Sequence, residues 1–223
     1  THPILHLRTS NKEGEEIIFY EAENEEDEAI FIIKTIKSLP FSYSSYAVLY
    51  RTNAQSRIIE EAFLHFGVPY VLIGGTRFYE RREIKDILAY LKLLVNPEDE
   101  ISLKRVKNLG KKRFLAFKKI FDQLRKDVKR KTTVELIEEI FSVTDYLSLY
   151  HSDDEEDYSR LENIKELKSV ALNFPRLLDF LQQVALVESE YFEKEKIDKD
   201  KSGVKLMTLH ASKGLEFKIV FIV

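Results

Sequence analysis

Polar side chains follow two apolar runs of the sequence, at the points where the runs end. The run Tyr46–Tyr50 leads directly into Arg51, and the run that begins at Val204 leads into "TLHASKGLE". Open parallel sheets bind ligands at the carboxyl ends of their strands, so both positions favour a binding site. An Arg there suits a phosphate, because its N–H donors match the phosphate oxygens and its charge is permanent. An aromatic ring beside it can stack on a base.

The second segment carries several side chains that could contact a ligand. They are Thr208, His210, Ser212, Lys213 and Glu216. A carboxylate such as Glu216 could accept a hydrogen bond from a ribose hydroxyl. Packing is the competing interpretation, because a Tyr that ends a strand usually packs, a single Arg usually forms a surface ion pair, and an isolated His is usually structural.

A third segment, "GGTRFYERREIKD", interleaves basic and aromatic side chains between Gly74 and Asp86. Arg77 and Phe78 lie next to its Gly turn. Such a combination can hold a single nucleic-acid strand through base stacking and phosphate contact. The alternative is a helix N-terminus with charged flanks.

The sequence excludes several other kinds of site. It has no Cys, no His cluster at metal-ligand spacing, no paired carboxylates and no Ser-His-Asp arrangement, so we expect no metal centre. It also has no G-x-x-x-x-G-K-[ST] loop, the phosphate cradle of P-loop NTPases. No apolar run approaches the roughly 20 residues of a membrane span.

The hydrophobic pattern predicts the elements that position these residues. Strand-like runs occur at Ile4–Arg8, Ile17–Tyr20, Tyr46–Tyr50, Tyr70–Ile73 and from Val204 onward. Helical periodicity predicts helices over 24–38, from a cap at Asn53 or Ser56 to Phe66, and over Arg82–Val95. Alternating strands and helices predict an α/β fold built on an open parallel sheet.

Strand signals disappear between residues 97 and 202, where helical patterns replace them. Helices are predicted around Phe114–Val128 and over Val134–Phe141, Leu161–Ala171 and Leu177–Val187, with linkers at Ser152–Asp157 and Glu193–Lys201. This pattern divides the chain into an α/β domain, residues 1–96 and 203–223, and an all-α insertion, residues 97–202.

Charge is unevenly distributed along a chain whose net charge is −3. Nine acids and no base lie between Glu13 and Glu28, whereas thirteen Lys or Arg and two acids lie between Lys104 and Lys131. Such a polarised chain is typical of a domain that touches a polyanion on one side, although a solvated helix face is the simpler explanation of a single charged run.

Three long motifs resemble one known family. "AVLYRTNAQSR", "GGTRFYERREIKDILAYLKLLVNPED" and "VKLMTLHASKGLEF" are similar to motifs IV, IVa and V of the UvrD/PcrA/Rep group of superfamily 1A DNA helicases. The resemblance implies a RecA-like P-loop NTPase fold. The chain would form the second motor domain, 2A, interrupted by a reduced helical insertion, 2B.

The resemblance also implies roles for individual residues. Tyr50 would stack on the adenine of ATP, Arg51 would be the catalytic arginine finger at the γ-phosphate, and Glu216 would bind the ribose. The DNA-binding residues would be Thr208, His210 and Lys213, with Arg77 and Phe78 near the same single strand.

The function implied is that of an ATP-dependent 3′–5′ helicase or translocase of DNA repair or replication in the bacterial cytoplasm. The whole enzyme would use ATP and Mg²⁺, and its partners would be single-stranded and junction DNA, repair proteins and an N-terminal RecA-like domain (1A/1B). Motifs I to III and VI are not found in this sequence. We therefore expect a fragment that is inactive alone and binds no cofactor.

Two alternatives remain open. The chain could belong to the motor subunit of a RecB/AddA-type helicase–nuclease, or it could be a non-enzymatic module that binds DNA or a protein. Relatives often carry a Gly-Ile-Gly hairpin that grips duplex DNA, whereas the matching stretch here reads "VKNLGKKRFLAF". Its basic side chains could still bind phosphates non-specifically.

Overall fold

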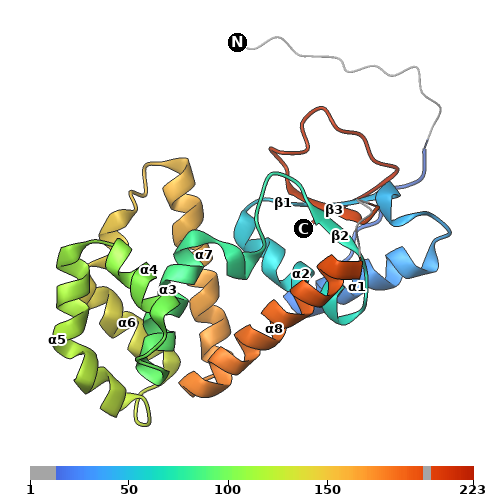
Figure 1. Cartoon of the computed structure of the whole chain (residues 1–223). Coiled ribbons are helices and arrows are strands. Elements are labelled where there is room, and N and C mark those ends of the chain that lie inside the picture. The colour runs from blue at the N-terminus through green and yellow to red at the C-terminus, as the bar shows by residue number, and fades with distance from the viewer. Residues whose placement is uncertain (1–13, 198–201) are drawn as a thin grey trace, which may run out of the picture.

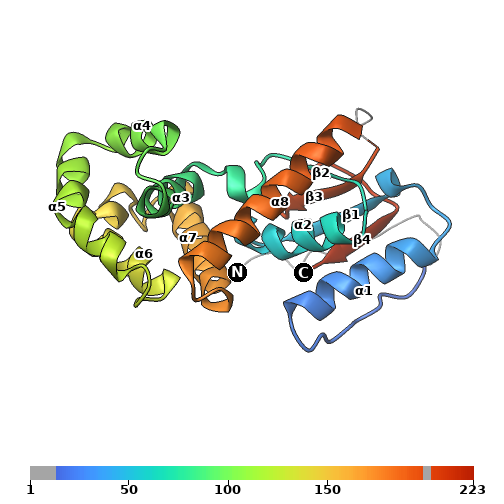
Figure 2. The same cartoon turned by 60° about the horizontal axis from the view of Figure 1, so that its bottom comes forward.

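The computed structural model describes residues 14–197 and 202–223, which form two lobes (Figure 1). The sheet lobe consists of α1 (Glu25–Ser38), β1 (Tyr46–Tyr50), α2 (Ser56–His65), β2 (Tyr70–Leu72), β3 (Val204–Thr208) and β4 (Ile219–Ile222). The helical lobe consists of α3 (Arg82–Val95), α4 (Glu100–Asn108), α5 (Lys111–Asp127), α6 (Thr133–Thr144), α7 (Glu155–Asn173) and α8 (Leu177–Ile197). Helix α8 runs from the helical lobe back to the sheet lobe in both views (Figures 1 and 2).

The sheet is parallel throughout, with strand order β2-β3-β1-β4. β1 therefore lies between β3 and β4, and all five of its residues are buried. The register pairs Tyr50 with Thr208, so β1 and β3 end side by side. This pairing confirms the predicted α/β fold with a parallel sheet, and it brings the two polar strand ends to the same edge.

A close backbone approach explains the residue at the entry to β3. A Cβ added to Gly203 would lie 2.6 Å from the Cα of Tyr70, closer than real Cβ contacts allow. Only glycine fits where β3 begins to pair with β2.

Helices α1 and α2 cover one face of the sheet. Asn24 caps α1 by accepting a hydrogen bond from the Asp27 backbone N–H at 2.9 Å, and four acids in the first turn favour the helix dipole. Ile32 and Ile36 of α1 and Phe63 of α2 pack on Val48 of the central strand in one buried cluster. This apolar burial fixes the face of β1 that looks toward α2.

A smaller apolar cluster covers the opposite face of the sheet. Ala47, Leu49 and Met207 are buried there beneath the half-buried side chains of Ala211 and Phe217. The last two belong to the loop that follows β3, which crosses this face (Figure 1). The loop that carries the predicted ligand contacts is therefore anchored on the sheet by its own apolar side chains.

The helical lobe has a separate and larger hydrophobic core. Helix α3 contributes most of its residues to that core, including Ile84, Leu88 and Leu91. Phe117 of α5 and Phe180 of α8 pack into the same core. The division at residues 96 and 97 stays a prediction, but side-chain packing already joins the helical lobe at Phe78, before α3 begins.

Several predicted elements need correction. Ile17–Tyr20 is not a strand: it pairs with no other strand of the described chain, and Ile17, Ile18 and Phe19 are exposed. The residue before α2 is Gln55, which makes no side-chain cap, and the capping box lies one turn earlier, between Thr52 and Gln55 at the start of the 3₁₀ turn Asn53–Gln55. The linkers are shorter than expected, because α7 begins at Glu155 and α8 continues to Ile197. The run Ile4–Arg8 lies outside the described residues.

Candidate nucleotide and DNA site

Three loops converge at the carboxyl edge of the sheet. The Leu209 backbone N–H donates to the carbonyl of Tyr50 at 2.9 Å, which extends the pairing of β1 and β3 by one residue. A Cβ on Gly74, in the loop after β2, would lie 3.7 Å from the Cβ of Ala211 in the loop after β3. A Cβ on Gly75 would lie 3.8 Å from Asn53 Oδ1 in the loop after β1. One ligand at this edge could therefore touch all three loops.

Arg51 stands at this edge with its side chain exposed. Its backbone is fixed, because the N–H groups of Arg51 and Thr52 both donate to Gln55 Oε1 at 2.9 Å. The guanidinium makes no hydrogen bond or ion pair with the part of the chain that the structure describes. A held backbone and an unpaired guanidinium are what capture of an anionic ligand requires.

Tyr50 lies differently from its neighbour, because only 2% of its surface is exposed. The ring belongs to the apolar cluster beneath α1 and α2. Burial and then the charge of Glu60 raise the pKa of Tyr50, so its hydroxyl stays neutral. Stacking of this ring on adenine stays a prediction, and it would require the ring to be uncovered.

The loop after β3 carries a second set of polar groups, which begins at the same edge. Thr208 Oγ1 accepts from the Ala211 backbone N–H at 3.2 Å, so its hydroxyl already holds the turn. His210 and Lys213 are exposed on the following turns, and Glu216 is exposed where the chain returns toward β4, whose Ile219 pairs with Tyr46 at the start of β1. The structure thus brings Thr208 to the strand end that Arg51 follows, whereas Glu216 lies toward the opposite end of the sheet. The contacts of these residues to DNA and ATP stay predictions.

Arg77 and Phe78 lie where the chain leaves the sheet lobe. The Arg77 guanidinium carbon lies 4.9 Å from the centre of the Tyr191 ring in α8, a cation–π contact. Phe78 is 0% exposed and belongs to the core of the helical lobe. Its contact with DNA stays untested, and the buried ring argues against it.

A buried polar group that the sequence analysis missed joins the two lobes. Its members, here called the interlobe cluster, are Ser56, Glu60, Tyr70, Arg81, Glu83, Asn163 and Tyr191. Arg81 donates through Nη2 to Ser56 Oγ and through Nη1 to Asn163 Oδ1, both at 2.8 Å. Asn163 Nδ2 in turn donates to Glu83 Oε1 at 2.6 Å. One guanidinium therefore bonds α2 and α7 at once.

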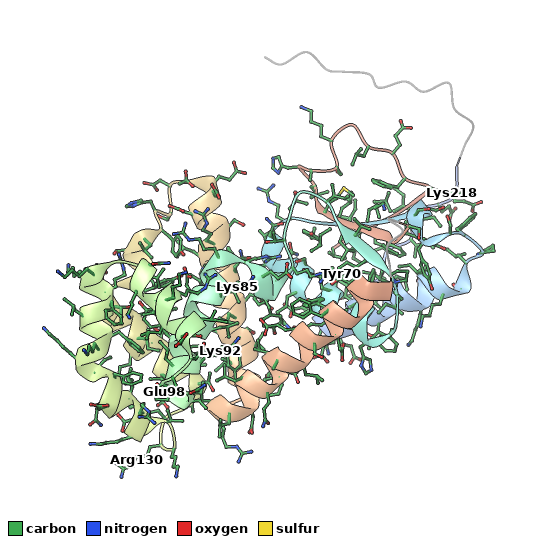
Figure 3. All side chains as sticks on the ribbon, in the orientation of Figure 1. Tyr70, Lys85, Lys92, Glu98, Arg130 and Lys218 are labelled. Atoms are coloured by element: carbon green, nitrogen blue, oxygen red, sulfur yellow. The ribbon has the colours of Figure 1, made fainter. Side chains whose placement is uncertain are left out.

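Glu60 lies at the centre of the interlobe cluster and has no exposed surface. Its carboxylate accepts from Ser56 Oγ at 2.6 Å, from Tyr191 at 3.3 Å and from Tyr70 at 3.4 Å. Burial raises the pKa of Glu60 to about 7, although the Ser56 hydroxyl and the Arg81 charge partly oppose that rise. Tyr70, which Figure 3 labels between the sheet and α8, belongs to β2.

The residues fit one part of an ATP site. Arg51 can meet a phosphate, and Glu216 can accept from a hydroxyl but lies toward the other end of the sheet. The described residues hold no group of three or more His, Cys, Asp or Glu that could bind a metal ion, so Mg²⁺ finds no ready ligand set among them.

Among the described helices, none has the length and apolarity to cross a bilayer.

The basic residues between Lys104 and Lys131 lie on the other lobe. Arg130, just after α5, lies at the far end of the helical lobe from Lys218 of the sheet lobe (Figure 3). Gly110 adopts a left-handed φ of 116° where α4 turns into α5, and Arg113 donates to Ser148 Oγ at 2.9 Å. Arg113, from the stretch that matches the Gly-Ile-Gly hairpin of relatives, thus has a structural partner within the lobe.

Comparisons with known proteins agree with this architecture. The family model described as the UvrD-like helicase C-terminal domain matches residues 2–161 and 107–223. The chain is 37% identical to the ATP-dependent DNA helicase PcrA of Bacillus subtilis over 268 residues. Matches to PcrA of Staphylococcus epidermidis and of Staphylococcus aureus reach 33% and 34% identity.

Each of these matches covers 97% of this chain and 36% of the relative, so the chain spans about a third of the length of the curated relatives. The alignment with the Bacillus protein has 268 positions and this chain has 223 residues, so that protein carries at least 45 residues without a counterpart here. The motif resemblance and the RecA-like architecture with a helical insertion are thus confirmed. The chain belongs to the UvrD-like helicase C-terminal domain family.

Proposed function

We propose that this chain supplies one side of the ATP site and part of the single-stranded DNA track of an ATP-dependent 3′–5′ DNA helicase of repair or replication. Family membership and the name of the relatives, ATP-dependent DNA helicase, support the reaction class. The observation that carries the proposal is the pairing of Tyr50 with Thr208, because it sets Arg51 and the loop after β3 at one edge.

Arg51 is the catalytic residue in this proposal. Its guanidinium would bind the γ-phosphate of ATP and stabilise the charge that develops as the phosphoryl group leaves. Glu216 would accept from the ribose, and Tyr50 would stack on the base once its ring is uncovered. Mg²⁺ would neutralise the phosphates when bound, through ligands other than these residues.

Thr208, His210 and Lys213 would contact single-stranded DNA, with Arg77 near the same strand. Thr208 ends β3, and His210 and Glu216 follow it in the next loop. A single segment would then touch both DNA and ATP. Such a shared segment is what a motor needs if closure on ATP is to move a nucleic-acid strand.

The test uses the full-length protein. Arg51→Ala is expected to lower DNA-stimulated ATP turnover by about 10³ or more while DNA affinity stays near normal, by analogy with arginine fingers. The matched control is Arg176→Ala, because Arg176 is exposed on the helical lobe and pairs only with Asp179 among the described residues. Unchanged turnover in Arg51→Ala would assign Arg51 a structural role.

Polarity and the need for further residues are tested separately. A partial duplex with a 3′ single-stranded tail should be unwound, whereas one with a 5′ tail should not. The 223-residue chain by itself should hydrolyse no ATP, because its sequence has no Walker loop to cradle the phosphates. A clear ATPase rate from that chain, lost in Arg51→Ala, would contradict this expectation.

A further inference from the structure

Arg81 is bonded to both lobes through separate nitrogens. It lies in the connection between the lobes, directly before α3, and 7% of its surface is exposed. Its Nη2 bonds Ser56 of α2 and its Nη1 bonds Asn163 of α7, each at 2.8 Å. Its Nε donates to the carbonyl of Thr76 at 3.3 Å. The planar fork leaves little freedom, so the three bonds fix the helical lobe against α2.

Glu60 makes a second connection between the lobes. Tyr191, near the end of α8, donates its hydroxyl to Glu60 Oε2, and Tyr70 of β2 donates to the same oxygen. Glu60 Oε1 accepts from Ser56, whose Oγ is also bonded by Arg81. Movement of α8 against the sheet lobe must therefore break a buried hydrogen bond or carry Glu60 with it.

The start of α2 connects this cluster to the end of β1. Ser56 follows Gln55 directly, and Gln55 Oε1 accepts from the backbone N–H groups of Arg51 and Thr52, each at 2.9 Å. Arg51 is the proposed catalytic arginine. The interlobe cluster is thus connected to the strand end that Arg51 follows. Its members Asn163 and Tyr191 come from α7 and α8 of the helical lobe.

We propose that Glu60 and Arg81 are positioning residues that couple the seating of the helical lobe to the conformation of Tyr50 and Arg51. This inference rests on the proposed function. With the helical lobe seated, the cluster holds Tyr50 buried and the strand end fixed. When Asn163 withdraws, Arg81 loses a hydrogen-bond partner, and when Tyr191 withdraws, Glu60 loses one. Either loss loosens the contacts of Ser56 at the start of α2, so the strand end moves and ATP binds differently.

The chain offers a matched control for this idea. Arg57 and Glu166 also join α2 to α7, with Arg57 Nε 2.6 Å from Glu166 Oε1. This ion pair is partly exposed and does not belong to the interlobe cluster. Breaking this ion pair weakens a contact between the same two helices without removing any hydrogen bond of the interlobe cluster.

The experiment compares three variants of the protein as its gene encodes it. Tyr191→Phe removes one hydroxyl and keeps the ring that Arg77 contacts, and Asn163→Leu removes the bridge between Arg81 and Glu83. Glu166→Gln is the control. Tyr191→Phe is the milder change, so it decides the question if Asn163→Leu fails to fold.

Two measurements are made on each variant. Amide hydrogen exchange is followed at Arg51 and Leu209, whose N–H groups bond Gln55 and Tyr50 at the strand ends. The KM for ATP and kcat are measured with saturating single-stranded DNA. Both cluster variants should raise the exchange rate and the KM by about three- to ten-fold, the effect of one lost hydrogen bond, with a smaller change in kcat. Glu166→Gln should leave both quantities unchanged.

The outcomes separate this inference from the proposed function. If the wild-type protein hydrolyses ATP and Tyr191→Phe leaves the exchange rate or KM unchanged, the coupling is wrong. An equal effect from Glu166→Gln would also overturn it, because loosening of the lobes would then suffice. If the wild-type protein hydrolyses no ATP, the proposed function fails, and amide exchange alone decides whether the helical lobe holds the strand end.

Discussion

Replacing Glu60 with Gln should change how the stability of the protein depends on pH. The Glu60 side chain is fully buried, and burial raises its pKa from an ordinary value of 4.5 to about 7. The folded state therefore holds a proton that the unfolded chain has released at intermediate pH. Gln has nearly the same shape and carries no charge at any pH, so the variant removes this titration without leaving a cavity.

The magnitude follows from the two pKa values of Glu60. The stabilisation is fully present below the unfolded value of 4.5 and is lost as the pH rises through about 7. A difference of about 2.5 pKa units corresponds to about 3 kcal/mol, at about 1.4 kcal/mol per unit. The free energy of unfolding of Glu60→Gln, minus that of the wild type, should thus rise by about 3 kcal/mol from acid to neutral pH.

The tyrosine and arginine side chains around Glu60 do not change their charge between acid and neutral pH, so they do not alter this pH dependence of the free energy of unfolding. The pKa values of Tyr50, Tyr70 and Tyr191 are raised, chiefly by burial, so these hydroxyls stay neutral below their ordinary range. Burial lowers the pKa of Arg81, but an Arg side chain keeps its charge throughout neutral pH. Glu60 therefore titrates between acid and neutral pH, whereas the side chains in contact with it, Ser56, Tyr70, Tyr191 and Arg81, do not.

Urea unfolding followed by far-UV circular dichroism measures the difference, at several pH values between about 5 and about 8. The part of this free-energy difference that does not change with pH depends on how the Gln amide fits among the hydroxyls of Ser56, Tyr70 and Tyr191. The test is therefore the change of the difference with pH. Glu16→Gln makes the same chemical change on an exposed carboxylate and is the matched control. A difference that stays constant across this range for Glu60→Gln would refute the assignment of a raised pKa.

Three further substitutions test the packing. Gly203→Ala should cost about 1–3 kcal/mol in urea unfolding, because the added Cβ would lie 2.6 Å from the Tyr70 backbone, whereas Gly14→Ala has nothing within 4 Å and should be neutral. Phe180→Ala should cost about 3–5 kcal/mol, because that ring is fully buried in the helical lobe, and an unchanged unfolding midpoint would contradict this core. Thr132→Ala should cost about 1 kcal/mol by removing the capping box of α6, measured in the same way.

The sequence predicts the interior of the fold well and its periphery poorly. Tyr46–Tyr50 and Arg82–Val95 are found at the predicted bounds, because a continuous apolar run and a strong helical period leave few alternatives. Ile17–Tyr20 has equal local propensity, yet it forms no strand. A strand needs a partner whose place depends on the whole sheet, and no local pattern encodes that partner.

The edge on which the proposed site lies was predictable, but the state of its side chains was not. Parallel strands share a carboxyl edge, so Arg51 and the loop after β3 could be expected near one another. Tyr50 is buried in the apolar cluster that Ile59 and Phe63 of α2 join, and Glu60 is buried on the same helix. Glu60 lies on a helix whose recognisable apolar face is formed by Ile59 and Phe63, and a Glu there is expected to be exposed.

The position of the interlobe cluster indicates how movement of the helical lobe could change the conformation of the sheet lobe. Ser56 and Glu60 lie one turn apart on α2, the helix that begins just after Arg51 and its capping box. A displacement of α2 therefore moves the start of that helix and the proposed catalytic arginine together. Partners for the same two side chains come from α7 and α8 through Arg81 and Tyr191. Because these groups are buried and mutually bonded, they favour two discrete arrangements over gradual deformation, which is the property that a coupling element needs.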